Sequence, residues 1–308
     1  MQSPLCASVH EALVDRIPTD LLDVLTSASS DVQLGMTLHA AALKRATAAA
    51  TVALTIEINC EHFIFTHELH DDVFEDRVQL ALLAIDGHGT PVYAESLDYD
   101  LRLSAEAHHR MQAFGLRTNH RISLLPGYRQ LYVAARESGA REAGWICCEL
   151  DVPDFVVQTS AMSGILLTAA TADLAYTVHS DPEIAKLLPG PPTARRDFVR
   201  GDVLAVYVEI YRAAQSSALS SPAIATRLIA ASGQEIFKST QVGATQRESD
   251  TACHVYVVHV PLRDVSPGSY LLRVEAAPDE RRGCLTPIDA TSTKRDIRIN
   301  VHPYPGLA

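Results

Sequence analysis

The sequence predicts a mostly β protein made of two β-sandwich domains in tandem. Short segments rich in Thr, Val and Ile recur along the chain, turn signals separate them, and one motif, a Pro-Gly turn followed by a strand, occurs twice. Regular short strands with few helices are typical of sandwiches or barrels. The length of 308 residues also fits about two domains.

The chain divides into three predicted parts. Residues 1–35 form a lead-in that is partly helical or disordered, residues 36–155 form the first sandwich domain, and residues 160–303 form the second. In the lead-in, apolar residues recur at helical spacing, and Pro18 interrupts a continuous helix unless it lies in a first turn. These apolar residues are Val9, Leu13, Ile17, Leu21 and Leu25.

In the first domain, alternating apolar residues predict a series of strands with one inserted helix. Asp86-Gly87-His88-Gly89 is a turn signal that joins Arg77–Asp86 and Val92–Leu101 in a hairpin. Ser104 is a cap for a short helix that runs to Phe114 and ends at Gly115. Other predicted strands are Met36–Leu43, Ala50–Ile58, a strand carrying Phe63, Phe65 and Leu69 with His67 between them, Arg121–Leu125, Arg129–Arg136 and Trp145–Val152.

In the second domain, Asp197–Tyr211 gives the longest strand signal, because apolar residues occupy both of its faces. Residues 180–196 contain four prolines and are predicted to form a loop or an ordered excursion, and Ala213–Ser221 is predicted to be a flexible connection. Further predicted strands are Gly164–Thr168, Ala223–Ala231, Glu235–Thr240, Ala252–Pro261, Ser269–Ala276 and Lys294–Val301.

The repeated motif indicates that the two domains share a fold. Pro126-Gly127 and Pro267-Gly268 lie 141 residues apart, since 267 − 126 = 141. Each is followed by a strand that buries alternate residues, which are Leu131 and Val133 in one copy and Leu272 and Val274 in the other. We therefore expect two immunoglobulin- or fibronectin-III-like sandwiches.

Composition restricts the classes of partner. The net charge is −11, and tight basic pairs such as Arg195–Arg196 and Arg281–Arg282 are scattered and form no stripe, so nucleic acid is not an expected partner. No apolar run reaches the ~18–20 residues of a membrane helix. Residues 1–30 lack the basic start and apolar run of a signal peptide, so we expect no export signal there.

An ordered series of segments resembles the region that follows the von Willebrand factor A (VWFA) module in bacterial VWFA-related proteins. The segments are Gln2–Leu5, Thr37–Lys44, Ala50–Ile58, Leu101–Leu116, Ile122–Ala135, Glu149–Phe155, Ser163–Thr168, Arg196–Tyr211 and Val260–Glu275. The resemblance implies non-catalytic, extracytoplasmic sandwich domains that bind a protein partner, contact an upstream A-type domain or act as a spacer. The Asp-x-Ser-x-Ser metal motif of the A module does not occur in this sequence, so its metal site is not carried over.

One polar cluster offers an alternative function. His62, His67, His70, Asp71 and Asp72 lie close together in sequence, and imidazole and carboxylate groups are ligands for Zn or Ni. His67 and His70 are three residues apart, which does not match the helical His-Glu-x-x-His spacing. A solvated strand face that leads into an acidic turn is the simpler interpretation, and a metal-dependent enzyme or metal-binding domain is the alternative.

No other pattern indicates catalysis. The sequence contains no Gly-x-Ser-x-Gly, phosphate loop or dinucleotide fingerprint, and the six cysteines show no metal-ligand spacing. Arg200-Gly201-Asp202 spells an integrin-binding tripeptide but precedes a strong strand, where Gly-Asp is an ordinary turn. Aromatic residues make up only 6%, which disfavours carbohydrate binding on a sandwich face. We therefore expect a non-enzymatic protein without a cofactor.

Overall fold

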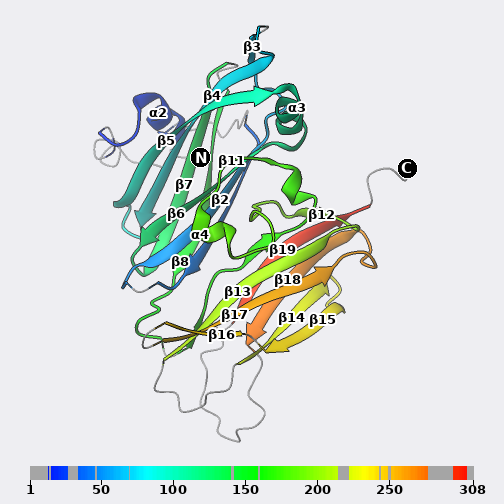
Figure 1. The fold of residues 1–308 in the computed structure, drawn as a ribbon. Helices are drawn as coiled ribbons and strands as arrows, with labels where there is room; N and C mark the ends of the chain where they lie inside the picture. Colours follow the sequence, from blue (N-terminus) through cyan, green and yellow to red (C-terminus); the bar gives the residue numbers. More distant parts are fainter. Residues whose placement is uncertain are drawn as a thin grey trace, which may run out of the picture. The chain divides into compact units, whose positions relative to one another are not determined.

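A computed structural model describes residues 13, 15–26, 34–45, 47–68, 70–139, 142–158, 160–213, 222–242, 244–248, 251–276 and 294–303. Strands dominate these residues, which confirms the predicted mostly β class (Figure 1). Contacts divide the chain into two compact units. The first is drawn from Met1–Ala40, Leu54–Val152 and Leu174–Ser180, and the second from Ala41–Ala53, Pro153–Asp173 and Asp181–Ala308.

The first unit contains a sheet built around one long hairpin. Strand β4 (Val73–Asp86) pairs with β5 (Pro91–Ser104) on one side and with β7 (Gly127–Glu137) on the other, and β7 pairs with β8 (Ala143–Val152). The short β3 (Thr66–Glu68) pairs with the start of β4. The predicted hairpin is confirmed, and its turn closes with an Asp86 N–H to Thr90 O bond of 2.9 Å.

A second sheet has the order β1 (Met36–Leu43), β2 (Ala50–Ile58), β6 (Leu116–Leu124) and β11 (Tyr176–His179). Helix α3 (Ala105–Phe114) joins β5 to β6 as predicted: the Ser104 hydroxyl accepts from Ala107 N, and Gly115 follows with a φ of 79°. Helix α2 (Thr19–Thr26) packs its leucines against β7, β8 and β4. The lead-in is thus helical at Thr19–Thr26, while residues 15–18 and 34–35 are turns or irregular.

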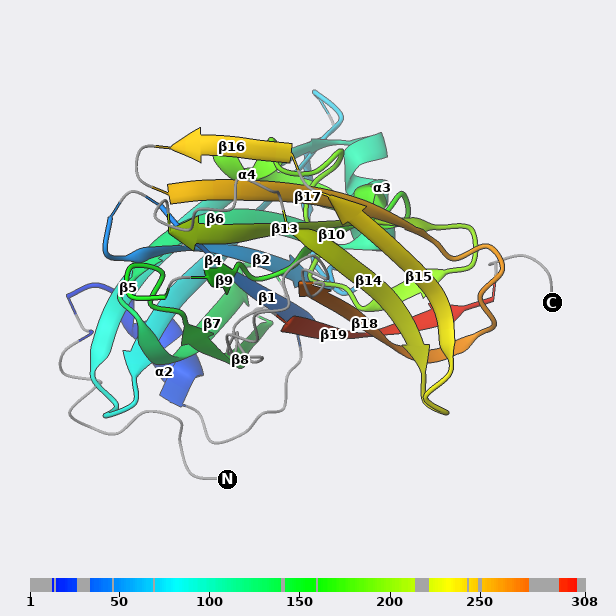
Figure 2. The ribbon, with the colours of Figure 1, turned by 90° about the horizontal axis from the view of Figure 1, so that it is seen from below.

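The second unit contains two sheets of five strands. One has the order β10 (Leu166–Thr168), β13 (Val203–Ala213), β17 (Thr251–Pro261) and β16 (Ala244–Glu248), with β9 (Ser160–Met162) also paired to β13. The other has the order β12 (Asp197–Val199), β19 (Lys294–His302), β18 (Gly268–Ala276), β14 (Ala223–Ala230) and β15 (Glu235–Val242), seen from another side in Figure 2. A 3-10 turn, η1 (Ala172–Leu174), and helix α4 (Pro182–Ala185) lie in the connections.

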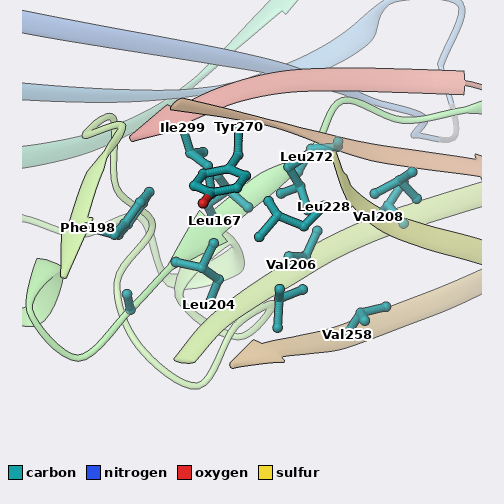
Figure 3. Packing of buried hydrophobic residues seen from close by; sticks show 14 of the residues in the cluster. Leu167, Phe198, Leu204, Val206, Val208, Leu228, Val258, Tyr270, Leu272 and Ile299 are labelled. Atoms are coloured by element: carbon teal, nitrogen blue, oxygen red, sulfur yellow. The ribbon is translucent and has the colours of Figure 1, made fainter. Parts of the chain in front are cut away.

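One hydrophobic cluster joins these two sheets. Alternate residues of β13 and β17 meet alternate residues of β18 and β19, because successive strand side chains point to opposite faces. Figure 3 shows Val206, Tyr270 and Leu272 pointing toward one another, with Phe198 at one side. The alternating apolar residues of these strands thus form one hydrophobic core between the two sheets.

The repeated Pro-Gly motif has the same place in both units. Strand β7 lies between β4 and β8, and β18 lies between β14 and β19. In each copy, the side chain two residues after Gly folds back to the carbonyl four residues before it. Arg129 Nη2 donates to Leu125 O at 2.9 Å, and the Tyr270 hydroxyl donates to Ser266 O at 2.7 Å. The motif therefore anchors equivalent turns.

The predicted long strand Asp197–Tyr211 is wrong in one respect, because the chain turns between β12 and β13. The buried Asp202 carboxylate accepts from Val199 N at 3.1 Å, which closes the turn. Strand β12 then pairs in parallel with β19. Strands β9, β11 and β16 and helix α4 were not predicted, and residues 214–221 of the predicted flexible connection lie outside the described residues. No helix among the described residues is long and apolar enough to cross a membrane.

Candidate functional site

Several connections of the first unit meet at one end of its β4 sheet, which we call the loop end. It comprises the segment Asn59–Phe65 after β2, the β3–β4 hairpin, helix α3, and the turn Ser138–Gly139 after β7. Register places β3 and the last residue of β5 beside the start of β4, and the end of β7 beside Val78. Loops at one end of a β framework are common places for binding residues.

Four rings pack together at the loop end. His67 on β3 lies opposite Phe74 on β4, and their rings stack at 4.3 Å with an interplanar angle of 8°. His108 of α3 covers the other face of Phe74 at 4.1 Å and 3°. Phe65 meets His108 edge-on at 4.6 Å. A hairpin and a helix thus position one half-exposed aromatic stack, which we call the ring stack.

Charged groups flank the ring stack. His67 Nε2 lies 2.9 Å from Asp72 Oδ1, and Asp72 occupies the left-handed region with φ 51°, which Asp tolerates better than most residues. Arg102 on β5 reaches Asp71 at 3.6 Å and Glu75 at 3.3 Å. Burial, followed by the neighbouring charges of His109 and His67, lowers the pKa of His108. A neutral His108 at pH 7 suits stacking against Phe74.

The residues proposed from sequence as metal ligands lie at this end but do not converge. Only His67 and Asp72 are joined directly, while Asp71 turns to Arg102 and both His62 and His70 are exposed. In the described part of the chain, no three His, Cys, Asp or Glu side chains are placed to hold a metal ion. Sequence analysis missed Phe74 and His108, because their contact requires the helix to fold back onto the hairpin.

We expect purified protein to carry no stoichiometric Zn or Ni, because a two-group contact is too few for a stable site, which needs three or four protein ligands. Elemental mass spectrometry of the wild type and of a His67→Ala, His70→Ala variant checks this. Stoichiometric metal that disappears in the double variant would contradict the expectation and support the metal-binding alternative.

A buried carboxylate in the second unit is held by its own strand. Glu209 on β13 accepts hydrogen bonds from the hydroxyls of Tyr207 and Tyr211, two residues away on either side. Arg45 lies 3.8 Å from the Glu209 carboxylate. Burial and the charge of Glu209 raise the pKa of both tyrosines. These groups satisfy one another inside the sheet, which is a structural arrangement.

A second polar network lies in the first unit between β5, β6 and β11. The Tyr99 hydroxyl lies 2.6 Å from His120 Nε2 and 2.9 Å from the Thr118 hydroxyl. His179 stacks on His120 at 4.6 Å, and its Nδ1 donates to Asn119 O at 2.8 Å. The network fixes the short strand β11 beside β6.

The Arg-Gly-Asp tripeptide does not present its carboxylate. Asp202 is 2% exposed and accepts from Thr171 N at 3.1 Å, from the Thr171 hydroxyl and from Val199 N. An integrin-type contact needs an accessible carboxylate. The tripeptide is therefore a turn, as its position before a strand indicated.

Comparison with known proteins gives no relative to guide the assignment: no protein-family model matches the chain, and no curated protein matches it.

Proposed function

We propose that this chain is a non-catalytic, protein-binding module of two immunoglobulin-like units, and that its binding surface is the loop end of the first unit. The observation that carries the proposal is the half-exposed ring stack of His67, Phe74, His108 and Phe65. Aromatic side chains supply much of the energy of protein interfaces, and acidic neighbours favour a partner with cationic side chains.

Strand order supports the immunoglobulin-like part of the proposal. In the second unit, β9 and β10, β13, β17 and β16 follow the A-B-E-D order, and β12, β19, β18, β14 and β15 extend the G-F-C order. The Tyr270 hydroxyl bonds back to Ser266 O at the start of the F-like strand, which is the contact of a tyrosine corner.

The first unit supports the same assignment. Its sheets have the orders β5-β4-β7-β8 and β1-β2-β6, of which the first unit includes β1 up to Ala40 and β2 from Leu54, and these orders correspond to C′-C-F-G and A-B-E. Arg129 takes the position of the corner tyrosine and donates to the Leu125 and Pro126 carbonyls. In sandwiches of this type, the connections between B and C and between F and G lie at one end, as at the loop end here.

We also propose, from sequence resemblance alone, that the module is the β region of a bacterial VWFA-related protein and acts outside the cytoplasm beside an A-type domain or another protein. Fractionation of source cells with an antibody against the module tests the location. Recovery in the cytoplasmic fraction alone would remove this part of the proposal and leave the binding surface to be tested separately.

We expect a His67→Glu, Asp72→Lys variant to lose binding, with partner affinity at least about tenfold weaker, because the outer ring and its flanking charge both change. Affinity capture with quantitative mass spectrometry from source cells identifies the partner, and interferometry with the purified partner measures affinity. A Tyr128→Ser variant is the matched control, since Tyr128 is exposed near the Asp86–Thr90 turn at the other end of β4. Equal binding by wild type and the loop-end variant would contradict the proposed surface.

A further inference from the structure

Strand β15 forms a long free edge of one sheet in the second unit. Among the described residues it pairs only with β14, so along its other side the backbone N–H and C=O groups face no described strand. Such a row of backbone groups is a template on which another strand can add. The edge of β15 is therefore a place where a second chain can extend the sheet.

The other edge strands of the described sheets are shorter, more charged or partly covered. Strands β3, β9, β10 and β12 have three residues each, β11 has four and β16 has five. Strand β5 begins at Pro91 and carries four charged residues, β8 carries Glu149 and Asp151, and β1 receives a backbone hydrogen bond from the segment after β9. Proline, charge and short length protect edges from pairing. Strand β15 has eight residues, no proline and a single lysine.

The exposed side chains of β15 form a row that is apolar at both ends. Ile236 is 38% exposed and Val242 is 69% exposed, and the exposed Lys238 and Thr240 lie between them. Phe237 points to the other face, where it packs against the core of the unit. From either end the exposed row is thus apolar, polar, polar and apolar. A row with this symmetry can pair with a second copy of itself.

Strand geometry restricts how two copies of β15 can pair. In an antiparallel pair directly opposite residues share one face of the sheet, so a two-fold axis perpendicular to the sheet sets one residue opposite itself. With Ser239 at this centre, Ile236 lies opposite Val242 of the second copy, and Lys238 lies opposite its Thr240. A centre at Lys238 would oppose two like charges, and a centre at Thr240 would place Ile236 beyond the end of the other β15.

We propose that β15 pairs antiparallel with β15 of a second copy about Ser239, so that two sheets of five strands become one sheet of ten. Backbone hydrogen bonds and the two apolar contacts hold this isologous interface. A bulge opposite Ile229 lies at the first end of β15 and leaves Phe237–Val242 in regular register with β14. The surface belongs to the second unit, so the proposal does not depend on the loop end.

Sedimentation velocity of the free, full-length chain, from micromolar to near-millimolar concentration, tests the pairing. We expect the wild type to change from monomer to dimer as its concentration rises. Thr240→Lys sets two lysines opposite each other at both symmetric positions, so its dissociation constant should be at least about fivefold larger. Thr240 is exposed, so the fold of the monomer should be unaffected.

A charge-swapped double variant tests the register. Lys238→Glu combined with Thr240→Lys sets opposite charges against each other at both positions and should restore dimerisation to at least the wild-type level. Lys238→Glu alone sets a carboxylate opposite Thr240 and should stay within about threefold of the wild type.

Val92→Lys is the matched control for added charge, because Val92 is 43% exposed on β5, an edge strand of the first unit, and this variant should dimerise as the wild type does. A wild type that stays monomeric at every concentration would overturn the proposal. A dimer that Thr240→Lys does not weaken, or that the double variant does not restore, would also overturn it.

Discussion

Replacement of Arg117 by methionine is expected to lower the free energy of unfolding of the first unit by about 3–5 kcal/mol, because it leaves the Glu57 carboxylate charged inside the fold. Arg117 on β6 is 0% exposed, and its Nε donates to Glu57 Oε1 on the neighbouring strand β2 at 2.8 Å. Denaturant unfolding, followed by hydrogen exchange of β4 and β7 peptides, measures the loss in this unit.

Two further variants separate the buried charge from the lost packing. A Glu57→Met, Arg117→Met double variant should regain most of the stability, because apolar residues of similar volume can replace a buried ion pair. Arg77→Met is the matched control, since it breaks the exposed pair with Asp100 in the same unit and should cost about 0–1 kcal/mol. Equal losses for Arg117→Met and Arg77→Met would show that Arg117 is more hydrated than its burial indicates.

The alternation of apolar residues in the sequence predicted most of the strands of the fold. Predicted strands Met36–Leu43 and Ala50–Ile58 match β1 and β2, and the helix from Ser104 to Gly115 matches α3 with both caps. These elements depend on local rules of alternation, capping and turn chemistry, which act within about ten residues. The repeated Pro-Gly motif also predicted equivalent turns, because its hydrogen bond closes within five residues.

Elements that depend on distant contacts were missed. Strand β11 has only four residues and exists because it pairs in parallel with β6, some 60 residues earlier. The turn between β12 and β13 is closed locally by Asp202 and Val199, but the Asp202 carboxylate is also held by Thr171, 31 residues away. Neither contact leaves a periodic signal in the sequence. A short strand or an interrupted one can therefore be recognised only after its partner is placed.

The candidate site was also predicted only in part, because its residues come from distant segments. The histidine- and aspartate-rich segment marked the β3–β4 hairpin, but the sequence suggested metal ligation, whereas the structure pairs His67 with Phe74 and Asp72. The buried carboxyl group of Glu137 was invisible in sequence, because it looks like an ordinary acidic residue of a strand. Its burial follows from the placement of β7 beside β4 and of the segment after β2 beside the end of β7.

Phe198→Ala is expected to lower the free energy of unfolding of the second unit by about 3–5 kcal/mol, because a buried aromatic ring leaves a cavity that its neighbours fill only in part. Phe198 is 1% exposed and belongs to the cluster that joins the two sheets (Figure 3). It lies on β12, whose three residues pair in parallel with β19 beside Val301. A three-residue strand has few ladder hydrogen bonds, so loss of the ring is expected to weaken the attachment of β12 to β19. Exchange of the Val301 and Asn300 amides should then become faster.

Ile236→Ala is the matched control for Phe198→Ala. Ile236 is 38% exposed on β15, the opposite edge of the same sheet, so the change should cost well under about 1 kcal/mol. Denaturant unfolding with hydrogen exchange of β18 and β19 peptides reports on this unit separately from the first. A loss of under about 1 kcal/mol for Phe198→Ala would mean that β12 detaches readily and that the core of β13, β17, β18 and β14 closes without it.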